Sequence, residues 1–287
     1  MVFFGHNQKL HFVPGPEPIQ ALMQIPARPG RNRYLRKFLT FACLAGCVSG
    51  LFACAVPVAA QRASASLKIL VYGASGKLGT HVIDEALQRG HLVTAVSRDP
   101  SGITRTDPHL SVVRGNILDP ESVASLVAGQ DVVIISVRGI ISRSKNPEDT
   151  VARSGVEKVV DALRAEGDGA ARLIHVGGSG SLEDASGKLY ADTLPDIFIP
   201  AKLQTEIAGQ VAALQYLRSV TDVNWSYATP PKNFTNGKRT GVFRLGGDQL
   251  MKDASGRSRV SRADFAVALL DEAEKAEHPR QRFSVAY

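Results

Sequence analysis

Residues 68–79 of this 287-residue chain read KILVYGASGKLG. The segment Ile69–Tyr72 is apolar and rich in β-branched residues, which predicts a buried strand. Three glycines follow at the spacing GxxGxxG, and an apolar pattern of helical period opens directly after them. In such a strand–turn–helix unit, Gly73 turns the chain, Gly76 lets the backbone approach a pyrophosphate, and Gly79 lets the helix lie close to the strand. The stretch therefore predicts a dinucleotide-binding turn, with an ordinary glycine-rich turn as the alternative.

Beyond this turn, the chain alternates strand patterns with helical patterns. Strand alternating with helix predicts right-handed crossovers, and hence an α/β fold with a doubly wound parallel sheet of the Rossmann type. Asp119 and Pro120 have the residue types of a helix N-cap and first helical position. The further predicted strands are His91 to Ser97, Leu110 to Val113, Asp131 to Val137, Arg172 to Val176 and Asn224 to Ala228, and helices are predicted through 156–163 and over about 201–218.

The alternation stops after Pro231. Residues 241–245 and a Gly246-Gly247 turn predict a small β excursion, and Ser261 is placed to cap a helix. Arg282 to Tyr287 is predicted to be a last strand. We therefore expect residues 67–287 to form a single NAD(P)-binding Rossmann domain with a small C-terminal β/α excursion.

Residues 1–66 differ in character and are set apart as a leader. Residues 1–30 contain several prolines and no apolar period, so we expect disorder there. A basic run at 31–37 precedes an apolar stretch, 38–60, that ends in small residues, which is the layout of a signal peptide. We expect export to the periplasm or beyond. The alternatives are an uncleaved membrane anchor, a lipoprotein signal at Cys47, and a cytoplasmic protein whose start is misassigned. A start at Met23 instead of Met1 would give a more ordinary leader.

The positive charge of the chain is concentrated in this leader. Seven Lys and Arg residues and one Glu within residues 1–66 account for six of the seven net positive charges, so residues 67–287 carry a net charge of +1. A nearly neutral body gives no indication of nucleic-acid binding. All three cysteines lie in the leader and the body histidines show no metal spacing, so we expect no metal site. Membrane contact is expected only through the leader, and the sequence predicts no oligomeric state.

The end of the second strand indicates the cofactor. An NAD site usually places an acid there to bind the ribose 2′-OH, whereas an NADP site uses Arg. Here Ser97 and Arg98 occupy the position, and Asp99 comes one residue too late. Lys77 adds a second positive charge in the glycine loop. We therefore expect NADP(H), with Arg98 as an ordinary surface residue as the alternative.

These motifs, with 115–119, 176–182, 225–231 and 237–241, resemble the atypical short-chain dehydrogenase/reductase superfamily. The similar branch contains biliverdin-IXβ/flavin reductase-like and NmrA-like proteins and bacterial NAD(P)-dependent oxidoreductases. The resemblance covers about residues 67–287. It implies a cofactor site made of Gly73, Ser75, Gly76, Lys77, Leu78, Gly79, Ser97, Arg98, Asn116, Ile117, Val137, Arg138 and Gly177. Within it, the glycine loop would hold the pyrophosphate, Asn116-Ile117 would flank the adenine, and Val137-Arg138 and 177–179 would lie along the nicotinamide.

The catalytic residues depart from the superfamily pattern. No tyrosine is followed four positions later by lysine, so the usual Tyr-x-x-x-Lys proton transfer is not expected. Ser179 and Ser181 can hydrogen-bond a substrate carbonyl or only shape their glycine-rich loop. Lys202 is a candidate proton donor, and otherwise an exposed helix residue. The catalytic candidates are therefore Ser179 and Lys202.

The leading hypothesis is an NADPH-dependent reductase that transfers hydride to a small conjugated acceptor such as a flavin or quinone. Such acceptors need a surface over the nicotinamide more than a dedicated acid, because water can supply the proton. Two alternatives remain open: a non-catalytic NADP(H) sensor or scaffold, and a sugar epimerase or dehydratase with an unidentified base.

Overall fold

The computed structural model describes residues 66–142, 145–193 and 199–287. The predicted leader, apart from Ser66, lies outside these residues. Among the described residues, no helix combines the length and apolar character that crossing a membrane requires.

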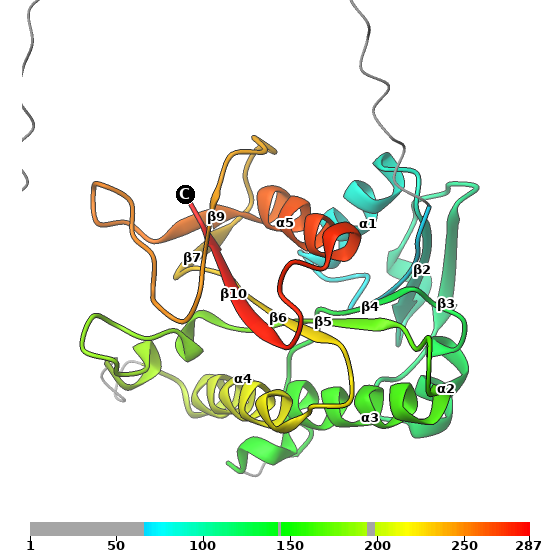
Figure 1. Ribbon diagram of the computed structural model, residues 1–287, viewed down its shortest axis with the longest axis horizontal. Helices are drawn as coiled ribbons and strands as arrows, with labels where there is room; N and C mark the ends of the chain where they lie inside the picture. Colours follow the sequence, from blue (N-terminus) through cyan, green and yellow to red (C-terminus); the bar gives the residue numbers. More distant parts are fainter. Residues whose placement is uncertain (1–65, 143–144, 194–198) are drawn as a thin grey trace, which may run out of the picture. The chain divides into compact units, whose positions relative to one another are not determined.

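The described chain forms one large sheet with helices on both faces (Figure 1). Its eight strands lie in the order β3-β2-β1-β4-β5-β6-β10-β8, and all neighbouring pairs are parallel except β10 with β8. These strands are β1 (Lys68–Tyr72), β2 (Leu92–Ser97), β3 (Leu110–Arg114), β4 (Val132–Ile135), β5 (Arg172–Val176), β6 (Trp225–Thr229), β8 (Arg244–Gly246) and β10 (Gln281–Ala286). The predicted α/β fold with a doubly wound, mostly parallel sheet is confirmed.

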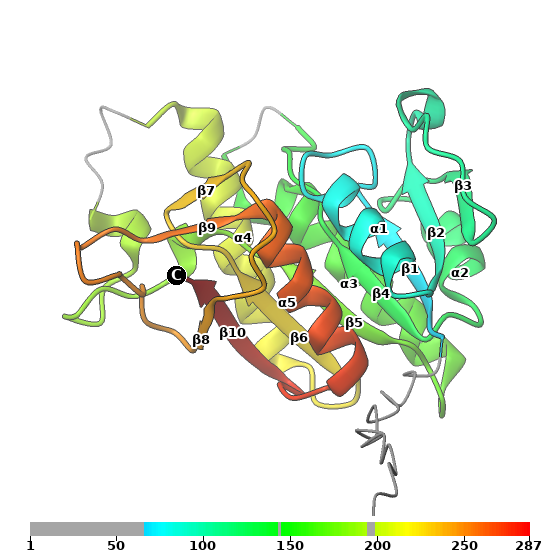
Figure 2. The ribbon, with the colours of Figure 1, turned by 90° about the horizontal axis from the view of Figure 1, so that it is seen from above.

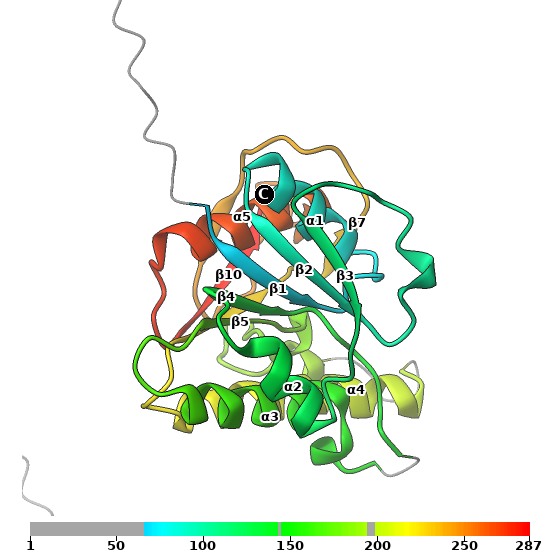
Figure 3. The same ribbon diagram turned by 90° about the vertical axis from the view of Figure 1, so that its right-hand side faces the viewer.

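Two helices cover one face of the sheet and three cover the other (Figures 1 and 3). The first face carries α1 (Gly79–Gln88) and α5 (Arg262–Lys275), and the second carries α2 (Pro120–Val127), α3 (Val151–Glu166) and α4 (Ala201–Ser219). Every residue of β4 and of β6 is buried. Strands covered on both faces exclude water from both sides, which explains why β4 reads as a continuous apolar run.

The N-caps of two helices agree with the sequence. The side chain of Asp119 accepts a hydrogen bond from the Glu121 amide at 3.1 Å, and Ser261 accepts one from the Asp264 amide at 3.0 Å. Each cap satisfies an N–H group that lacks a partner within its helix.

The C-terminal excursion is more elaborate than the sequence indicates. A separate two-stranded parallel sheet pairs β7 (Asn233–Thr235) with β9 (Arg259–Ser261). The predicted strand at 241–245 is shorter and later, as β8, and it pairs antiparallel with the last strand. Figure 2 shows β7 and β9 beside the N-terminal end of α5. The excursion therefore brings residues 232–234 and the start of α5 near the carboxyl end of β6.

Candidate active site

A cavity of about 700 Å³ opens at the carboxyl ends of the central strands. Parallel strands of this fold bind ligands at that edge, where the strand order reverses between β1 and β4. The walls come from the loops after β1, β4, β5 and β6, from one side of α4 and from the start of α5. They include Gly76, Lys77, Leu78, Ser136, Val137, Arg138, Gly139, Gly177, Gly178, Ser179, Gly180, Tyr190, Leu203, Glu206, Ile207, Gln210, Pro230, Pro231, Lys232, Phe234 and Arg262.

The turn between β1 and α1 is packed so closely that two of its glycines admit no side chain. Gly73 has φ +82°, and a Cβ there would collide with the carbonyl of Ser136. A Cβ on Gly79 would collide with the carbonyl of Gly73. The chain thus turns sharply at Gly73, and the start of α1 at Gly79 lies directly against that turn. This is the backbone geometry of a dinucleotide-binding turn.

The N-terminus of α1 offers an anion site to the cavity. The N–H groups of Lys77 and Leu78 donate to no described residue, and the N-cap residue Leu78 has no side-chain acceptor for the N–H groups of the first turn. Both residues line the cavity. Free N–H groups at a helix N-terminus suit a pyrophosphate, and the ammonium of Lys77 adds charge. The Gly76 amide, in contrast, donates to the carbonyl of Gly73 at 2.9 Å, so this glycine contributes room rather than a donor.

The end of β2 is tied to the glycine loop through a pair of hydroxyl groups. Ser97 Oγ donates to the carbonyl of Asp99 at 2.8 Å and lies 3.1 Å from Ser75 Oγ. The Asp99 carboxylate accepts from the amide and hydroxyl of Ser101, and the Ser101 hydroxyl and amide lower the pKa of Asp99. The Asp99 carboxylate thus points toward its own loop, whereas the Arg98 side chain is exposed beside it.

Asn116 and Ile117 do not line the cavity. The side-chain oxygen of Asn116 accepts from the Leu118 amide at 3.1 Å, which stabilises the turn after β3. Ile117 is buried and packs against Gly155 of α3, where an added Cβ would lie 3.1 Å from it. Val137, Arg138 and Gly177 do line the cavity. That an adenine lies beside Asn116 and Ile117 therefore stays a prediction.

The two serines after β5 have different surroundings. Ser179 lines the cavity, and its hydroxyl forms no hydrogen bond with a described residue. Ser181 is buried, and its hydroxyl donates to the carbonyl of Gly178 at 2.8 Å. The guanidinium of Arg282, on β10, donates to the carbonyl of Ser181 at 2.5 Å and so holds the loop from below. Ser179 is available to a ligand, and Ser181 shapes the loop.

Helix α4 turns a different side toward the cavity than the sequence suggests. Leu203, Glu206, Ile207 and Gln210 line it, at the spacing of one helical face. Lys202 is exposed and is not part of the lining. The structure therefore brings Ser179, but not Lys202, to the candidate site.

Sequence reasoning also missed cavity residues outside α4. Tyr190 comes from the short η4 (Tyr190–Thr193), Lys232 and Phe234 from the segment after β6, and Arg262 from the first turn of α5. The Lys232 ammonium lies 5.6 Å from the centre of the Tyr190 ring. Pro230-Pro231 marks the end of β6 in the sequence, but nothing there indicates that the following residues enter a site.

A buried polar group supports the loop after β5 from beneath. A Cβ on Gly177 would collide with the Tyr227 ring, whose hydroxyl donates to the carbonyl of Gln210 at 2.8 Å. The His175 ring stacks on Tyr227 with centroids 5.2 Å apart, and its Nε2 lies 3.3 Å from Gln210 Oε1. Burial lowers the pKa of His175 to about 4 and raises the pKa of Tyr227. Both groups are therefore neutral near pH 7 and serve as packing beneath the cavity.

Metal chemistry has no evident site in the described residues. There, no group of three or more His, Cys, Asp or Glu side chains is arranged to hold an ion.

Comparison with known proteins agrees with this geometry. A family model described as NAD(P)H-binding matches residues 73–275. The uncharacterized protein YwnB of Bacillus subtilis is 31% identical over 224 residues, which cover 76% of this chain and 98% of YwnB. A solved structure of a candidate exported protein from Burkholderia pseudomallei has 34% identity and a TM-score of 0.65, covering 77% of this chain and 100% of that one. A candidate NADH-flavin reductase from Streptococcus pneumoniae has 27% identity and a TM-score of 0.63, covering 77% and 99%.

The Rossmann-type fold, the glycine turn and these relatives define an NAD(P)H-dependent oxidoreductase. Within that class, the chain belongs to the NAD(P)H-binding family, and its resemblance to the atypical short-chain dehydrogenase/reductase superfamily is confirmed.

Proposed function

We propose that this protein is an NADPH-dependent reductase that transfers hydride to a small conjugated acceptor such as a flavin or quinone. The observation that carries the proposal is that one continuous cavity runs from the anion-binding turn at Gly76–Leu78, past Ser179, to Lys232 and Phe234. One continuous space can hold a cofactor and an acceptor side by side. The likeness to the Streptococcus pneumoniae protein supports a flavin as the acceptor.

Different residues along this cavity would bind the cofactor and the acceptor. Lys77 and the N-terminus of α1 would hold the pyrophosphate, and Val137, Arg138 and Gly177 would border the nicotinamide. Bound NADPH would supply the hydride. The free hydroxyl of Ser179 would orient the acceptor by a hydrogen bond, and water reaching the open cavity would supply the proton.

Selection of NADPH over NADH would rest on Ser97 and Arg98 at the end of β2. Asp99 is occupied by Ser101 and is not presented to a ribose 2′-OH. The exposed guanidinium of Arg98 suits a 2′-phosphate, since Arg forms charge-assisted hydrogen bonds with phosphate oxygens.

A second candidate function is carbonyl reduction, which one pair of residues favours. Tyr190 and Lys232 both line the cavity and lie next to each other, although they are far apart in the sequence. A phenol beside an ammonium can pass a proton to a carbonyl oxygen. Replacement of Tyr190 by Phe separates the candidates: reduction of ketones or aldehydes would disappear if the phenol donates the proton, whereas flavin reduction would persist.

The test of the main proposal is NADPH oxidation by the purified full-length protein with a flavin or quinone present. Gly76→Val should abolish turnover, because its side chain would enter the space that the pyrophosphate requires. Gly247→Val is the matched control, since an added Cβ at Gly247 contacts nothing within 4 Å and the residue lies away from the cavity. Ser179→Ala should cost one hydrogen bond, about 0.5–1.5 kcal/mol in kcat/KM.

One result would count against hydride transfer and another against the cofactor position. Tight NADPH binding without oxidation by any flavin, quinone or carbonyl compound would favour the sensor hypothesis. Unchanged turnover in Gly76→Val would place the cofactor elsewhere.

A further inference from the structure

The cavity is lined by an excess of positive charge. Among the described residues that line it, the basic side chains are Lys77, Arg138, Lys232 and Arg262, and the one acidic side chain is Glu206. Within the described chain none of the four cations forms an ion pair, although most other arginines do. Cations gathered in a concave site without carboxylate partners raise its affinity for anions.

The four cations fall into two groups along the sheet edge. Lys77 and Arg138 follow β1 and β4, the two strands at which the strand order reverses. Lys232 and Arg262 come from the opposite wall, after β6 and at the start of α5. The loop after β5, with Ser179, lies between the groups because β5 separates β4 from β6. A dinucleotide held at the β1 turn accounts for the first group and leaves the second for another ligand.

The second group is held in place by aromatic rings and one amide. The Arg262 guanidinium lies 5.1 Å from the centre of the Phe234 ring, and its Nη1 donates to Asn236 Oδ1 at 2.7 Å. The Lys232 ammonium lies over Tyr190. A guanidinium has five N–H donors, so most of those on Arg262 are still available. Both aromatic rings also line the cavity, which gives this end flat apolar surfaces beside the charges.

We propose that the acceptor of this enzyme carries an anionic substituent, a phosphate or carboxylate, which Lys232 and Arg262 bind. This inference rests on the proposed reductase function and narrows its substrate class: a planar conjugated acceptor with a charged tail. Ser179 faces the conjugated ring, and the two cations hold the tail at the β6 end of the cavity. Glu206, on α4, lines the same cavity, and its carboxylate would repel a negatively charged group of the acceptor placed near α4.

FMN and riboflavin provide a matched pair of probes, because they share one ring system and differ by a phosphate. The full-length protein, saturated with NADP⁺, is titrated with each flavin, and flavin fluorescence reports binding. Kinetics with NADPH then give kcat/KM for each. We expect FMN to bind at least about tenfold more tightly than riboflavin, since the phosphate meets two cations in a partly enclosed site. Added salt should reduce this ratio.

The double variant Lys232→Gln/Arg262→Gln should bring the FMN-to-riboflavin ratio close to one, mainly by raising Kd and KM for FMN. Lys238→Gln is the control, because Lys238 belongs to the same excursion, is exposed and does not line this cavity. It should retain the wild-type ratio.

Each outcome decides one of the two claims. Preferential FMN binding that the double variant loses supports the anionic site even if no flavin is reduced, in which case the reductase proposal fails separately. Equal binding of FMN and riboflavin, binding of neither, or an FMN preference that survives the double substitution would overturn the inference.

Discussion

Arg98 is exposed directly after β2, beside a loop whose own acid is already engaged. Its side chain forms no ion pair with a described residue, and Asp99 is held by the amide and hydroxyl of Ser101. The guanidinium is therefore available to a phosphate at the edge of the sheet. The Ser97 hydroxyl donates to a carbonyl, so Ser97 contributes mainly by fixing the glycine loop through Ser75.

Replacing Arg98 by Ala should remove most of a preference for NADPH over NADH. One lost charge-assisted contact corresponds to roughly 1.5–3 kcal/mol, on the order of tenfold to a hundredfold in NADPH affinity. Titration of the full-length protein with both cofactors measures the change. Arg257→Ala is the control, since its exposed side chain pairs with Asp253 outside the cavity. Equal affinity of the unmodified protein for NADPH and NADH would refute a role for Arg98 in cofactor choice.

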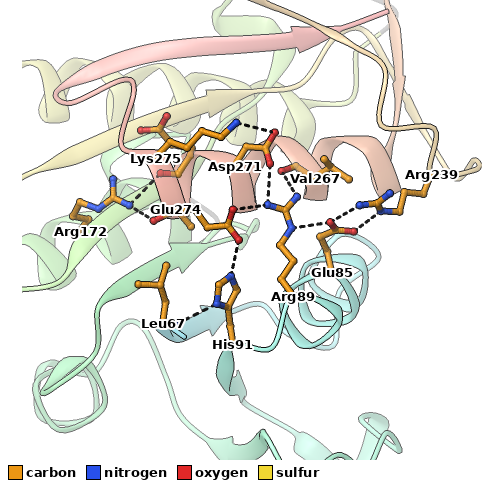
Figure 4. A network of polar contacts seen from close by, with 12 residues as sticks. Leu67, Glu85, Arg89, His91, Arg172, Arg239, Val267, Asp271, Glu274 and Lys275 are labelled. Atoms are coloured by element: carbon orange, nitrogen blue, oxygen red, sulfur yellow. Dashed lines mark hydrogen bonds and ion pairs between the residues drawn. The ribbon is translucent and has the colours of Figure 1, made fainter. Parts of the chain in front are cut away.

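At the scale of elements, α1 and α5 are joined by a network of ion pairs (Figure 4). Glu85 is 4% exposed and pairs with Arg89 at 2.9 Å and with Arg239 at 2.6 Å. Arg89 reaches Asp271 and Glu274 of α5, and Glu274 also contacts His91. The network fixes α5 against α1, whose N-terminus lines the cavity.

Replacing Glu85 by Gln should destabilise the fold by about 3 kcal/mol at pH 7, because two guanidinium groups lose their buried carboxylate. Urea unfolding measures the free energy. Asp84→Asn is the control. Asp84 is the neighbouring residue on α1, and it forms an ion pair with Arg105 in which both side chains are well exposed. An exposed pair contributes little, so that variant should lose less than about 1 kcal/mol.

The stability effect of Glu85→Gln should depend on pH, and the pKa of Glu85 gives the direction. Burial alone would raise the pKa of Glu85, but hydrogen bonds from Arg239 and Arg89 outweigh burial and lower it. Ionised Glu85 therefore stabilises the fold above its ordinary pKa of 4.5, and that contribution is lost as the pH falls further. The stability difference between Glu85→Gln and the unmodified protein should shrink in acid. A difference that stays constant down to the acid limit would show that charge at Glu85 is not the cause.

At the scale of the whole molecule, the C-terminal excursion completes the cavity. After β6 the chain forms β7, contributes β8 to the edge of the large sheet, forms β9, and returns through α5 to place β10 between β6 and β8. That path brings Lys232, Phe234 and Arg262 to the end of the cavity opposite the glycine turn. We therefore propose that the first half of the fold binds the cofactor and that the second half binds the acceptor.

The composition of residues 1–66 predicts export with cleavage before Gln61. N-terminal sequencing of the protein from its native host is the measurement. A mature N-terminus at Gln61 agrees with cleavage, and a lipid on Cys47 would indicate a lipoprotein. An intact leader in the cytoplasm would refute export. Because free NADPH is expected to be scarce outside the cytoplasm, an exported reductase would carry its cofactor within the folded protein.

The sequence alone determined the local elements of this protein. The strand and turn at residues 69–79, the alternation of strands with helices, and the caps at Asp119 and Ser261 are all found in the structure. Each depends on residues close together in the chain, whose backbone preferences and apolar period act locally. Such signals can be read without knowing which segments meet.

Only the tertiary structure decided which side chains share the cavity. Tyr190, Glu206, Lys232 and Arg262 come from four separate segments, and no local pattern relates them. Lys202 and Leu203 are neighbours in the sequence, yet only Leu203 lines the cavity, because the packing of α4 on α3 sets which face it presents. Side chains meet at a site through the crossing of distant elements, and that geometry depends on how the entire core packs.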